Sequence, residues 1–199
     1  MSRIGLEYGA TVDKFVGDAI MMFFGDPDSR GAGNDAIACI EMAIAMQQRM
    51  AELKTEWRER GIEHRLELRI GSNTGYCMVG NFGSEDCMDY TIIGNAVNLA
   101  ARLQSRAEVA CILMTNETYS LVKKLAHTEE EETIVVKGIP APARTYRVSN
   151  RYYDLTERGR VIRHDSDGLS LLIDRDKLSS ADWAGAIAAR EAAVAQLMS

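Results

Sequence analysis

The sequence predicts a domain of mixed helix and strand, either an α+β fold or an α/β sandwich. Strand-like and helix-like segments alternate along most of the chain, and several of the strand-like segments are close enough together to form hairpins. The composition, 46% hydrophobic and 26% charged residues, is close to that of an average globular protein. The 199 residues therefore suffice for one globular domain with an appendage.

The first strand-like region predicts a hairpin. Residues 10–24 contain two short runs of β-branched and aromatic residues, and the pair Gly17-Asp18 separates them. A glycine beside an aspartate is a common turn between two strands. We therefore expect Asp18 at an exposed turn.

A long helix is predicted from about Asp35 to Arg60, because apolar residues recur there at spacings of three, four and seven. Asn34 is the expected N-cap and Gly61 the expected C-cap. The apolar face would consist of Ile40, Ala43, Met50, Leu53 and Trp57.

The middle of the chain predicts three strands and a second helix. The segments LELRIGSNTG (66–75) and YCMVGNFG (76–83) are expected to pair with each other, and MDYTIIG (88–94) to form a further strand. Residues 94–107 predict a helix on which Asn98 and Arg102 share one face, since they lie four positions apart. The residues expected to pack are Val97, Ala100, Ala101 and Leu103.

The remaining segments complete the domain and begin an appendage. The strand ACILMT and the helix NETYSLVKKL are followed by a final strand pair, TIVVKG and RTYRV, around a proline-containing loop. We assign the domain to residues 1–149. Residues 150–199 are expected to form the appendage, in which GRVIRH and LSLLID make a hairpin ahead of an alanine-rich helix.

Charge and composition exclude several classes of function. The net charge is −6 and the basic residues are scattered, so the sequence has no basic patch for nucleic acid. No apolar run reaches the roughly 18 residues of a membrane span, and no secretory signal is visible. The four cysteines lack zinc-ligand spacing, so we expect reduced thiols and a cytoplasmic chain without membrane contact.

Four polar residues are candidates for chemistry on spacing alone: Lys14 and Asp18, four residues apart on the predicted hairpin, and Asn98 and Arg102 on one helical face. A carboxylate at a hairpin tip, such as Asp18, suits Mg²⁺, which prefers oxygen ligands. The alternative is that Gly17-Asp18 is only a turn. Likewise, Asn98 and Arg102 could be ordinary surface residues of a helix. The sequence contains no phosphate-binding GxxxxGK[ST] loop, no GxGxxG fingerprint and no GxSxG elbow.

Four segments in a fixed order carry a family resemblance: DKFVGDAIMMFFGDP, LRIGSNTGYCMVGNFG, DYTIIGNAVNLAARL and VVKGIPAPARTY. Together they resemble the class III nucleotidyl cyclase catalytic domain across residues 8–148. The block TIIGNAVNLAARL is the most specific, because it matches the family pattern G-x-x-V-N-x-A-x-R without a gap. The resemblance implies an α+β, ferredoxin-like nucleotidyl cyclase fold, with a central, mostly antiparallel sheet flanked by helices.

The resemblance also implies the residues that bind metal and base. Asp18 corresponds to the second of two aspartates that hold two Mg²⁺ or Mn²⁺ ions against the triphosphate. Lys14 corresponds to the lysine that recognises adenine, and Thr91 occupies the other purine-selecting position. The pair of lysine and threonine resembles the bacterial and bicarbonate-responsive subclass. It favours ATP, because guanylate cyclases typically carry glutamate and cysteine at these positions.

The implied activity is that of an adenylate cyclase, which converts ATP to 3′,5′-cyclic AMP and pyrophosphate for intracellular signalling. Asn98 would orient the ribose, Arg102 would stabilise charge on the transferring phosphate, and Lys137 would bind the triphosphate. The ribose 3′-hydroxyl attacks the α-phosphate in line, and two metal ions can clamp the attacking and leaving oxygens. The alternative is a non-catalytic module that dimerises or binds nucleotide. A diguanylate cyclase is disfavoured, because the chain has no GG[DE]EF string.

Family members are head-to-tail homodimers, in which one protomer supplies the base, ribose and phosphate residues and the other supplies the metal aspartates. The segment from Gly80 to Thr91 resembles the arm that reaches across this interface. An isolated protomer would therefore hold no complete site.

The chain departs from the family pattern at two places. The family's strand with the first metal aspartate is absent, and the 17 residues before Asp18 are expected to begin inside the last turn of the helix that follows that strand. This is compatible with a misassigned start, a fragment or a short gene product. We expect an exposed sheet edge, a non-native oligomer and little or no activity from residues 1–199 alone. Ser72 is a smaller departure, since an apolar residue is usual there.

Overall fold

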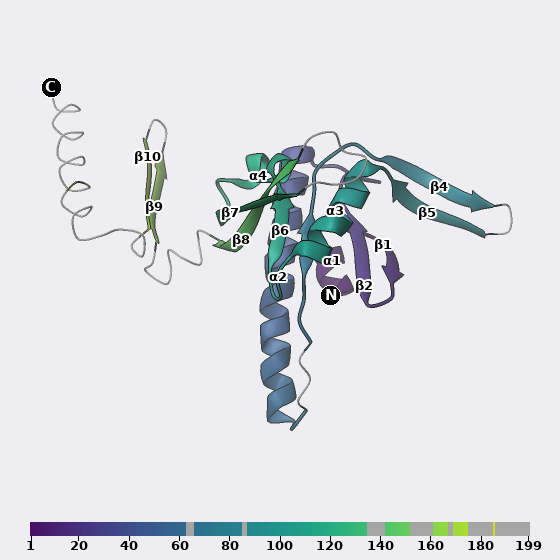
Figure 1. The fold of residues 1–199 in the computed structure, drawn as a ribbon, viewed down its shortest axis with the longest axis horizontal. Helices are drawn as coiled ribbons and strands as arrows, with labels where there is room; N and C mark the ends of the chain where they lie inside the picture. The colour runs from purple at the N-terminus through teal and green to yellow at the C-terminus, as the bar shows by residue number, and fades with distance from the viewer. Residues whose placement is uncertain are drawn as a thin grey trace. The chain divides into compact units, whose positions relative to one another are not determined.

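The computed structural model describes residues 1–62, 66–84, 87–134, 142–151, 161–166, 169–174 and 185. Contacts divide the chain into two units, Met1–Arg151 and Tyr152–Ser199. The elements of the first unit are α1 (Ser2–Glu7), β1 (Thr11–Val16), β2 (Ala19–Phe23), α2 (Ala32–Glu59), β3 (Ile70–Ser72), β4 (Met78–Ser84), β5 (Cys87–Ile93), α3 (Asn95–Arg106), β6 (Ile112–Thr115), α4 (Asn116–Val122), β7 (Ala126–Ile134) and β8 (Ala143–Arg151) (Figure 1).

The first unit is built on a four-stranded sheet in the order β3-β6-β8-β7. Strand β3 runs parallel to β6, whereas β6–β8 and β7–β8 are antiparallel. Two further antiparallel hairpins, β1–β2 and β4–β5, lie outside this sheet. Helices and mostly antiparallel strands are thus combined, which confirms the predicted α+β class.

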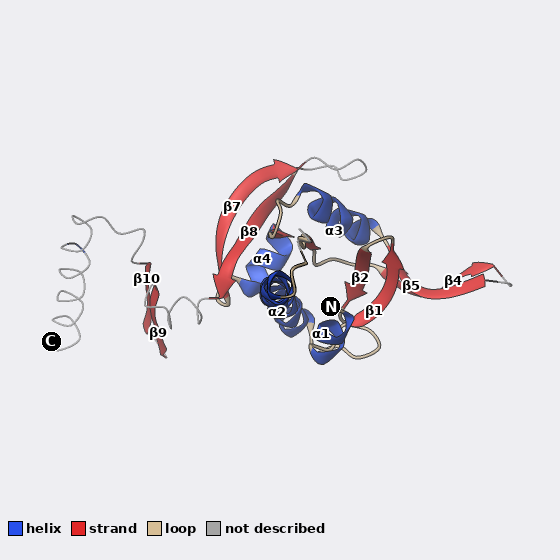
Figure 2. Ribbon diagram, turned by 90° about the horizontal axis from the view of Figure 1, so that it is seen from below, coloured by secondary structure: helices blue, strands red, loops and turns tan. Residues whose placement is uncertain are grey.

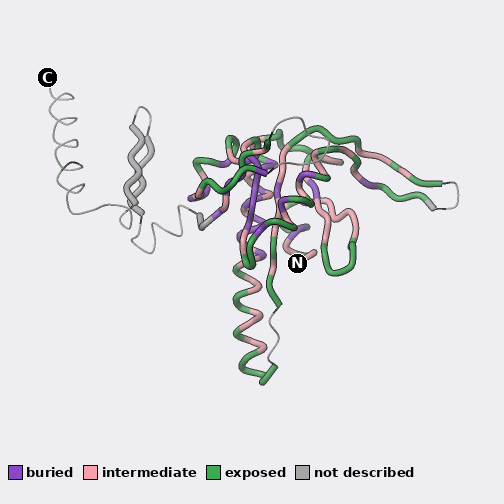
Figure 3. The backbone as a smooth tube through the Cα atoms, viewed as in Figure 1, coloured by how far each residue is buried: buried purple, intermediate pink, exposed green. Residues whose placement is uncertain are grey.

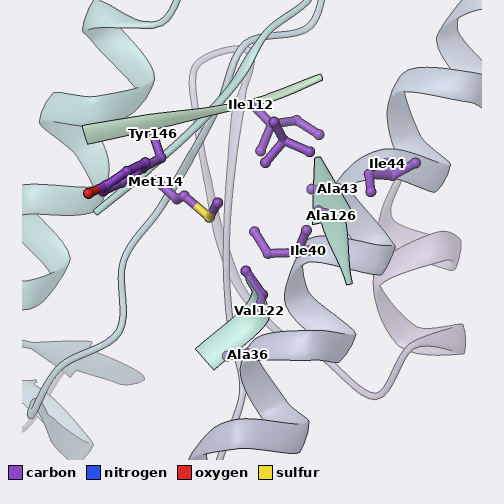
Figure 4. Packing of buried hydrophobic residues seen from close by; sticks show 10 residues of the cluster. Ala36, Ile40, Ala43, Ile44, Ile112, Met114, Val122, Ala126 and Tyr146 are labelled. Atoms are coloured by element: carbon purple, nitrogen blue, oxygen red, sulfur yellow. The ribbon is translucent and has the colours of Figure 1, made fainter. Parts of the chain in front are cut away.

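Helices cover both faces of the four-stranded sheet. All four residues of β6 are buried, because alternate side chains point into two separate clusters. Ile112 and Met114 pack with Ile40 of α2 and Val122 of α4 (Figure 4). On the other face, Leu113 packs with Leu99 and Leu103 of α3. Figure 2 shows α2 and α4 on one side of β6–β8 and α3 on the other.

Helix α2 begins at Ala32, three residues before the predicted start. The predicted N-cap, Asn34, is wrong, because Asn34 lies inside the first turn and its Nδ2 donates to the Arg30 carbonyl at 2.9 Å. At the other end, the expected Gly61 follows the helix with a φ of 70°, the left-handed conformation that terminates many helices.

Only the first half of α2 is buried. Ile40 and Ala43 lie in the core, as predicted, but Met50, Leu53 and Trp57 are partly exposed. In Figure 3 the second half of the helix carries no buried segment. The long apolar stripe therefore finds its packing partners over only part of its length.

The predicted pairing of residues 66–75 with 76–83 is wrong. Strand β3 pairs with β6, and β4 pairs with β5 in the register Met78↔Ile93 to Ser84↔Cys87. The hairpin β4–β5 projects from the rest of its unit (Figures 1 and 2), as expected for the extended arm. Its exposed apolar side chains are Met78, Met88, Tyr90 and Ile93.

The predicted helix over 94–107 is confirmed as α3. Its buried residues are Leu99 and Leu103. Leu103 was expected to pack, whereas Leu99 was not foreseen and Ala101 is exposed. Ser72, expected to be unusual at an apolar position, is buried, and its Oγ lies 3.4 Å from the Cys39 Sγ of α2. The thiol therefore gives this buried hydroxyl a polar partner.

The second unit contains β9 (Val161–Ser166) and β10 (Leu169–Asp174), which pair antiparallel. These are the two strands expected from GRVIRH and LSLLID. The predicted alanine-rich helix lies outside the described residues apart from Gly185. Within the described part of the chain, no helix has the length and apolarity needed to cross a membrane.

Candidate functional site

Two of the predicted site residues meet around a third that sequence reasoning missed. The Thr91 hydroxyl on β5 donates a hydrogen bond to Asp13 Oδ2 on β1 at 2.7 Å. Lys14 Nζ lies 3.8 Å from Asp13 Oδ1, too far for a hydrogen bond but close enough for electrostatic attraction. The Asp13 side chain is 1% exposed and that of Lys14 is 37% exposed. The buried carboxylate thus joins Lys14 to Thr91.

A β-bulge explains why adjacent residues can meet in this way. Val12 pairs with Met22 and Lys14 pairs with Met21, so Asp13 is the extra residue in the ladder. Neighbouring side chains on a regular strand point to opposite faces, whereas a bulge redirects one of them. The irregularity therefore brings the carboxylate and the ammonium group to the same side of β1.

A second polar contact fixes β5 against the first hairpin. The Tyr90 hydroxyl donates a hydrogen bond to Asp26 Oδ2, in the loop after β2. This bond raises the pKa of the Tyr90 hydroxyl, because it stabilises the protonated phenol next to a carboxylate. The Thr11 hydroxyl in turn donates to the Asp26 carbonyl at 2.6 Å. Two side-chain hydrogen bonds, one from Tyr90 and one from Thr91, thus connect β5 to the first hairpin and the loop after it.

Asn98 and Arg102 are both exposed on α3, four residues apart. The structure gives neither side chain a hydrogen bond or ion pair with the other described residues. Among the described residues Arg102 therefore has no salt-bridge partner, and its guanidinium is a solvated group on the exposed face of α3. The carboxamide and the guanidinium are available to an incoming ligand from the same helical face.

The backbone of α3 is held closely against β3. A Cβ added at Gly71 would lie 2.3 Å from the Ala100 carbonyl oxygen and 2.3 Å from the Gln104 nitrogen. The Asn73 side chain also donates from Nδ2 to the Ala96 carbonyl, at 3.0 Å. Glycine is thus required at Gly71 by the close approach of two backbones.

Asp18 lies at the exposed turn between β1 and β2, as predicted. On the hairpin, Lys14 pairs with Met21 and the last pair is Val16 with Ala19, so Asp18 lies in the turn beyond the end of the ladder. Within the ranges that the structure describes, no group of three or more His, Cys, Asp or Glu residues could hold a metal ion. Asp18 is therefore not part of such a group, and its carboxylate fits one part of a metal site but not a whole one.

The structure thus brings Lys14 and Thr91 together and places Asn98 and Arg102 on the helix that follows β5. It does not bring Asp18 to them. The predicted triphosphate residue, Lys137, lies outside the described residues. The missed residue, Asp13, carried one signal in the sequence, a charged residue next to Lys14 in a strand that also contains Val12, Phe15 and Val16.

Known proteins share sequence with most of this chain. The family described as the adenylate and guanylate cyclase catalytic domain matches residues 3–150. An adenylate cyclase from Anabaena cylindrica is 31% identical over 153 residues, which cover 71% of this chain and 28% of that protein. The chain spans about a quarter of the length of the curated relatives that it matches.

Two solved structures share both sequence and fold with the chain. The adenylyl cyclase CyaB from P. aeruginosa is 52% identical with a TM-score of 0.72, over 75% of this chain and 76% of that one. The guanylyl cyclase Cya2 is 30% identical with a TM-score of 0.68, over 75% of each chain. The ferredoxin-like nucleotidyl cyclase fold is thereby confirmed. This chain belongs to the class III adenylate and guanylate cyclase catalytic domain family.

Proposed function

We propose that this chain is an adenylate cyclase catalytic domain that converts ATP to 3′,5′-cyclic AMP and pyrophosphate. The observation that carries the proposal is the meeting of Lys14 and Thr91 around the buried Asp13 carboxylate. An ammonium group and a hydroxyl are held side by side, where they can contact the edge of a purine. The identity of 52% to an adenylyl cyclase, against 30% to a guanylyl cyclase, supports adenine as that purine.

The exposed face of α3 would act on the sugar and phosphates. Asn98 would hold the ribose so that its 3′-hydroxyl points at the α-phosphate. Arg102 would donate several hydrogen bonds from a planar guanidinium to phosphate oxygens that gain charge during transfer. Lys137 would bind the triphosphate as a point charge. Positioning and electrostatic stabilisation are the main contributions a protein makes to this kind of reaction.

Asp18 would hold Mg²⁺ or Mn²⁺ through its carboxylate. When bound, such ions supply charge stabilisation at the attacking and leaving oxygens. Because Asp18 lies in the turn and outside the cluster of Lys14, Asp13 and Thr91, we propose that it serves the site of a second protomer in a head-to-tail homodimer. The exposed Met78, Met88 and Ile93 on the β4–β5 arm are suited to such an interface. We place this reaction in the cytoplasm.

A complementation assay tests the proposal. The chain is mixed with a second cyclase domain that keeps both metal aspartates but has lost its own counterpart of Arg102. Cyclic AMP formation then depends on Asn98 and Arg102 of this chain. The chain alone, which offers Asp18 as its metal aspartate, should form little product.

The matched variants are Arg102→Ala and Arg106→Ala, two exposed arginines one turn apart on α3. Arg102→Ala should lower the rate by about 10³-fold or more, as for arginines in other phosphoryl-transfer sites. Arg106→Ala should keep the rate. Nucleotide binding without any product in the mixture would instead favour the non-catalytic alternative.

A further inference from the structure

Asp13 has no assigned role, although it is a buried carboxylate between two residues of the proposed site. A carboxylate at 1% exposure is costly to bury unless it is well partnered. Its partners are the Thr91 hydroxyl at 2.7 Å and the Lys14 ammonium group at 3.8 Å. We propose that Asp13 is the positioning residue that sets the preference for adenine over guanine. It holds the Thr91 hydroxyl as a hydrogen-bond acceptor toward the base, while Lys14 is the donor. The inference rests on the proposed function.

The first step concerns the Thr91 hydroxyl, which has one hydrogen to donate and two lone pairs that can accept. An ionised carboxylate can only accept, so the bond to Asp13 uses the hydrogen. The Thr91 oxygen, itself in a residue only 6% exposed, is thereby left as an acceptor. A hydroxyl without this bond could rotate, and could then accept from adenine or donate to guanine. The Thr91 hydroxyl can only accept, because its hydrogen is bonded to Asp13.

The second step concerns Lys14. Its ammonium group has three donors and no acceptor, and the distance of 3.8 Å to Asp13 leaves those donors free for a ligand. The bulge at Asp13 keeps the ammonium group on the same side of β1 as the carboxylate. The pair thus presents the donors of Lys14 and one acceptor, the Thr91 oxygen, whose direction is fixed by Asp13.

This pattern matches adenine and opposes guanine. Adenine carries a donor at N6 and an acceptor at N1, whereas guanine carries an acceptor at O6 and a donor at N1. The Thr91 acceptor can take the N6 amino group, and the Lys14 donor can reach N1. With guanine, the fixed Thr91 acceptor would face the O6 acceptor. A site built on directed hydrogen bonds rejects a mismatched ligand strongly, because buried groups are left unpaired.

The competing role is purely structural, with Asp13 tying β1 to β5. The two roles differ in what they predict for selectivity. If Asp13 only ties β1 to β5, loss of its carboxylate would weaken the binding of ATP and of GTP by the same factor. A residue that fixes the Thr91 hydroxyl should change the ratio of the two affinities.

The test measures competition by ATP and by GTP for a bound fluorescent ATP analogue in the presence of Mg²⁺, together with cyclic nucleotide formation in the complementation assay. In Asp13→Asn the amide can donate to Thr91, which frees the hydroxyl hydrogen for guanine O6. The ATP-to-GTP affinity ratio should fall by about tenfold or more. Tyr90→Phe is the matched control, since it removes the other polar contact of β5 and should leave the ratio unchanged.

A double-variant cycle excludes a general effect on folding. In a Thr91→Val background, which has no hydroxyl to orient, Asp13→Asn should cause no further change in the ratio. Should Asp13→Asn fail to fold, Thr91→Ser must keep the preference for ATP and Thr91→Val must lose it.

The outcomes separate the two proposals. An unchanged ratio in folded Asp13→Asn, with wild-type chain preferring ATP, overturns the role of Asp13 alone. Wild-type chain that binds neither nucleotide and forms no product overturns the proposed function and this inference with it.

Discussion

The Thr115 hydroxyl on β6 donates a hydrogen bond of 2.7 Å to Asn73 Oδ1, while Asn73 Nδ2 donates to the Ala96 carbonyl of α3 at 3.0 Å. Thr115 is fully buried. One side chain thus connects the central strand to the first turn of the helix that carries Asn98 and Arg102. Its removal should disturb both stability and the site.

Asn73→Ala is predicted to lower the free energy of unfolding by about 1–3 kcal/mol, because the buried Thr115 hydroxyl loses its partner. Urea unfolding followed by circular dichroism measures the change. Asn81→Ala, at an exposed position on the β4–β5 arm, is the control and should stay within about 0.5 kcal/mol. Equal effects of the two variants would contradict the role given to Asn73.

Gly71→Ala is predicted to destabilise the domain by about 1–3 kcal/mol and to displace α3, since the added methyl group meets backbone atoms that cannot rotate away. Gly33→Ala is the matched control. It adds the same methyl group in the first turn of α2, where nothing lies within 4 Å. Thermal unfolding should show Gly33→Ala unchanged or slightly more stable. A stable Gly71→Ala variant with normal ligand binding would refute the close approach.

Burial raises the pKa of the Cys39 thiol, and its hydrogen bond with Ser72 lowers it less. The thiolate is the reactive form, so Cys39 should react with N-ethylmaleimide more slowly than the exposed Cys77 at pH 8. Mass spectrometry of digested protein measures the two rates. Because the unfolded thiol ionises first, stability should also fall as pH rises above about 8.5. Equal alkylation rates at the two cysteines would contradict this.

Local patterns predicted those elements whose partners are near in sequence. The hairpin β1–β2 and the helix α3 were foreseen because a turn signal and a helical period lie within each segment. Strand β3 was assigned to the wrong partner, because its true neighbour, β6, is separated from it by an arm and a helix. The sequence of residues 66–83 contains no local pattern that indicates the pairing of β3 with β6.

Strand β7 shows a second limit of sequence reasoning. Its acidic residues gave no apolar alternation, so the predicted strand began only at residue 133. In the structure Arg147 of β8 pairs with Glu129 at 2.6 Å and with Glu131 at 2.9 Å. Such cross-strand charge pairs stabilise an exposed sheet face. They depend on a partner strand that a local window does not contain.

The site was predictable in its residue types but not in its geometry. Lys14, Thr91, Asn98 and Arg102 were found through motifs. The bulge that turns Asp13 toward Thr91 is a departure from strand register, and it leaves no mark in the spacing of residues. The hydrogen bond between Thr91 and Asp13 was therefore found only in the structure.

The most direct measurement is the identity and rate of the product formed when wild-type chain is mixed with the arginine-deficient cyclase domain and given ATP or GTP. Mass spectrometry should detect cyclic AMP from ATP well in excess of cyclic GMP from GTP, and Arg102→Ala should abolish both. Product formation that is equal for the two nucleotides, or that persists in Arg102→Ala, would contradict the account of an adenine-selective cyclase domain.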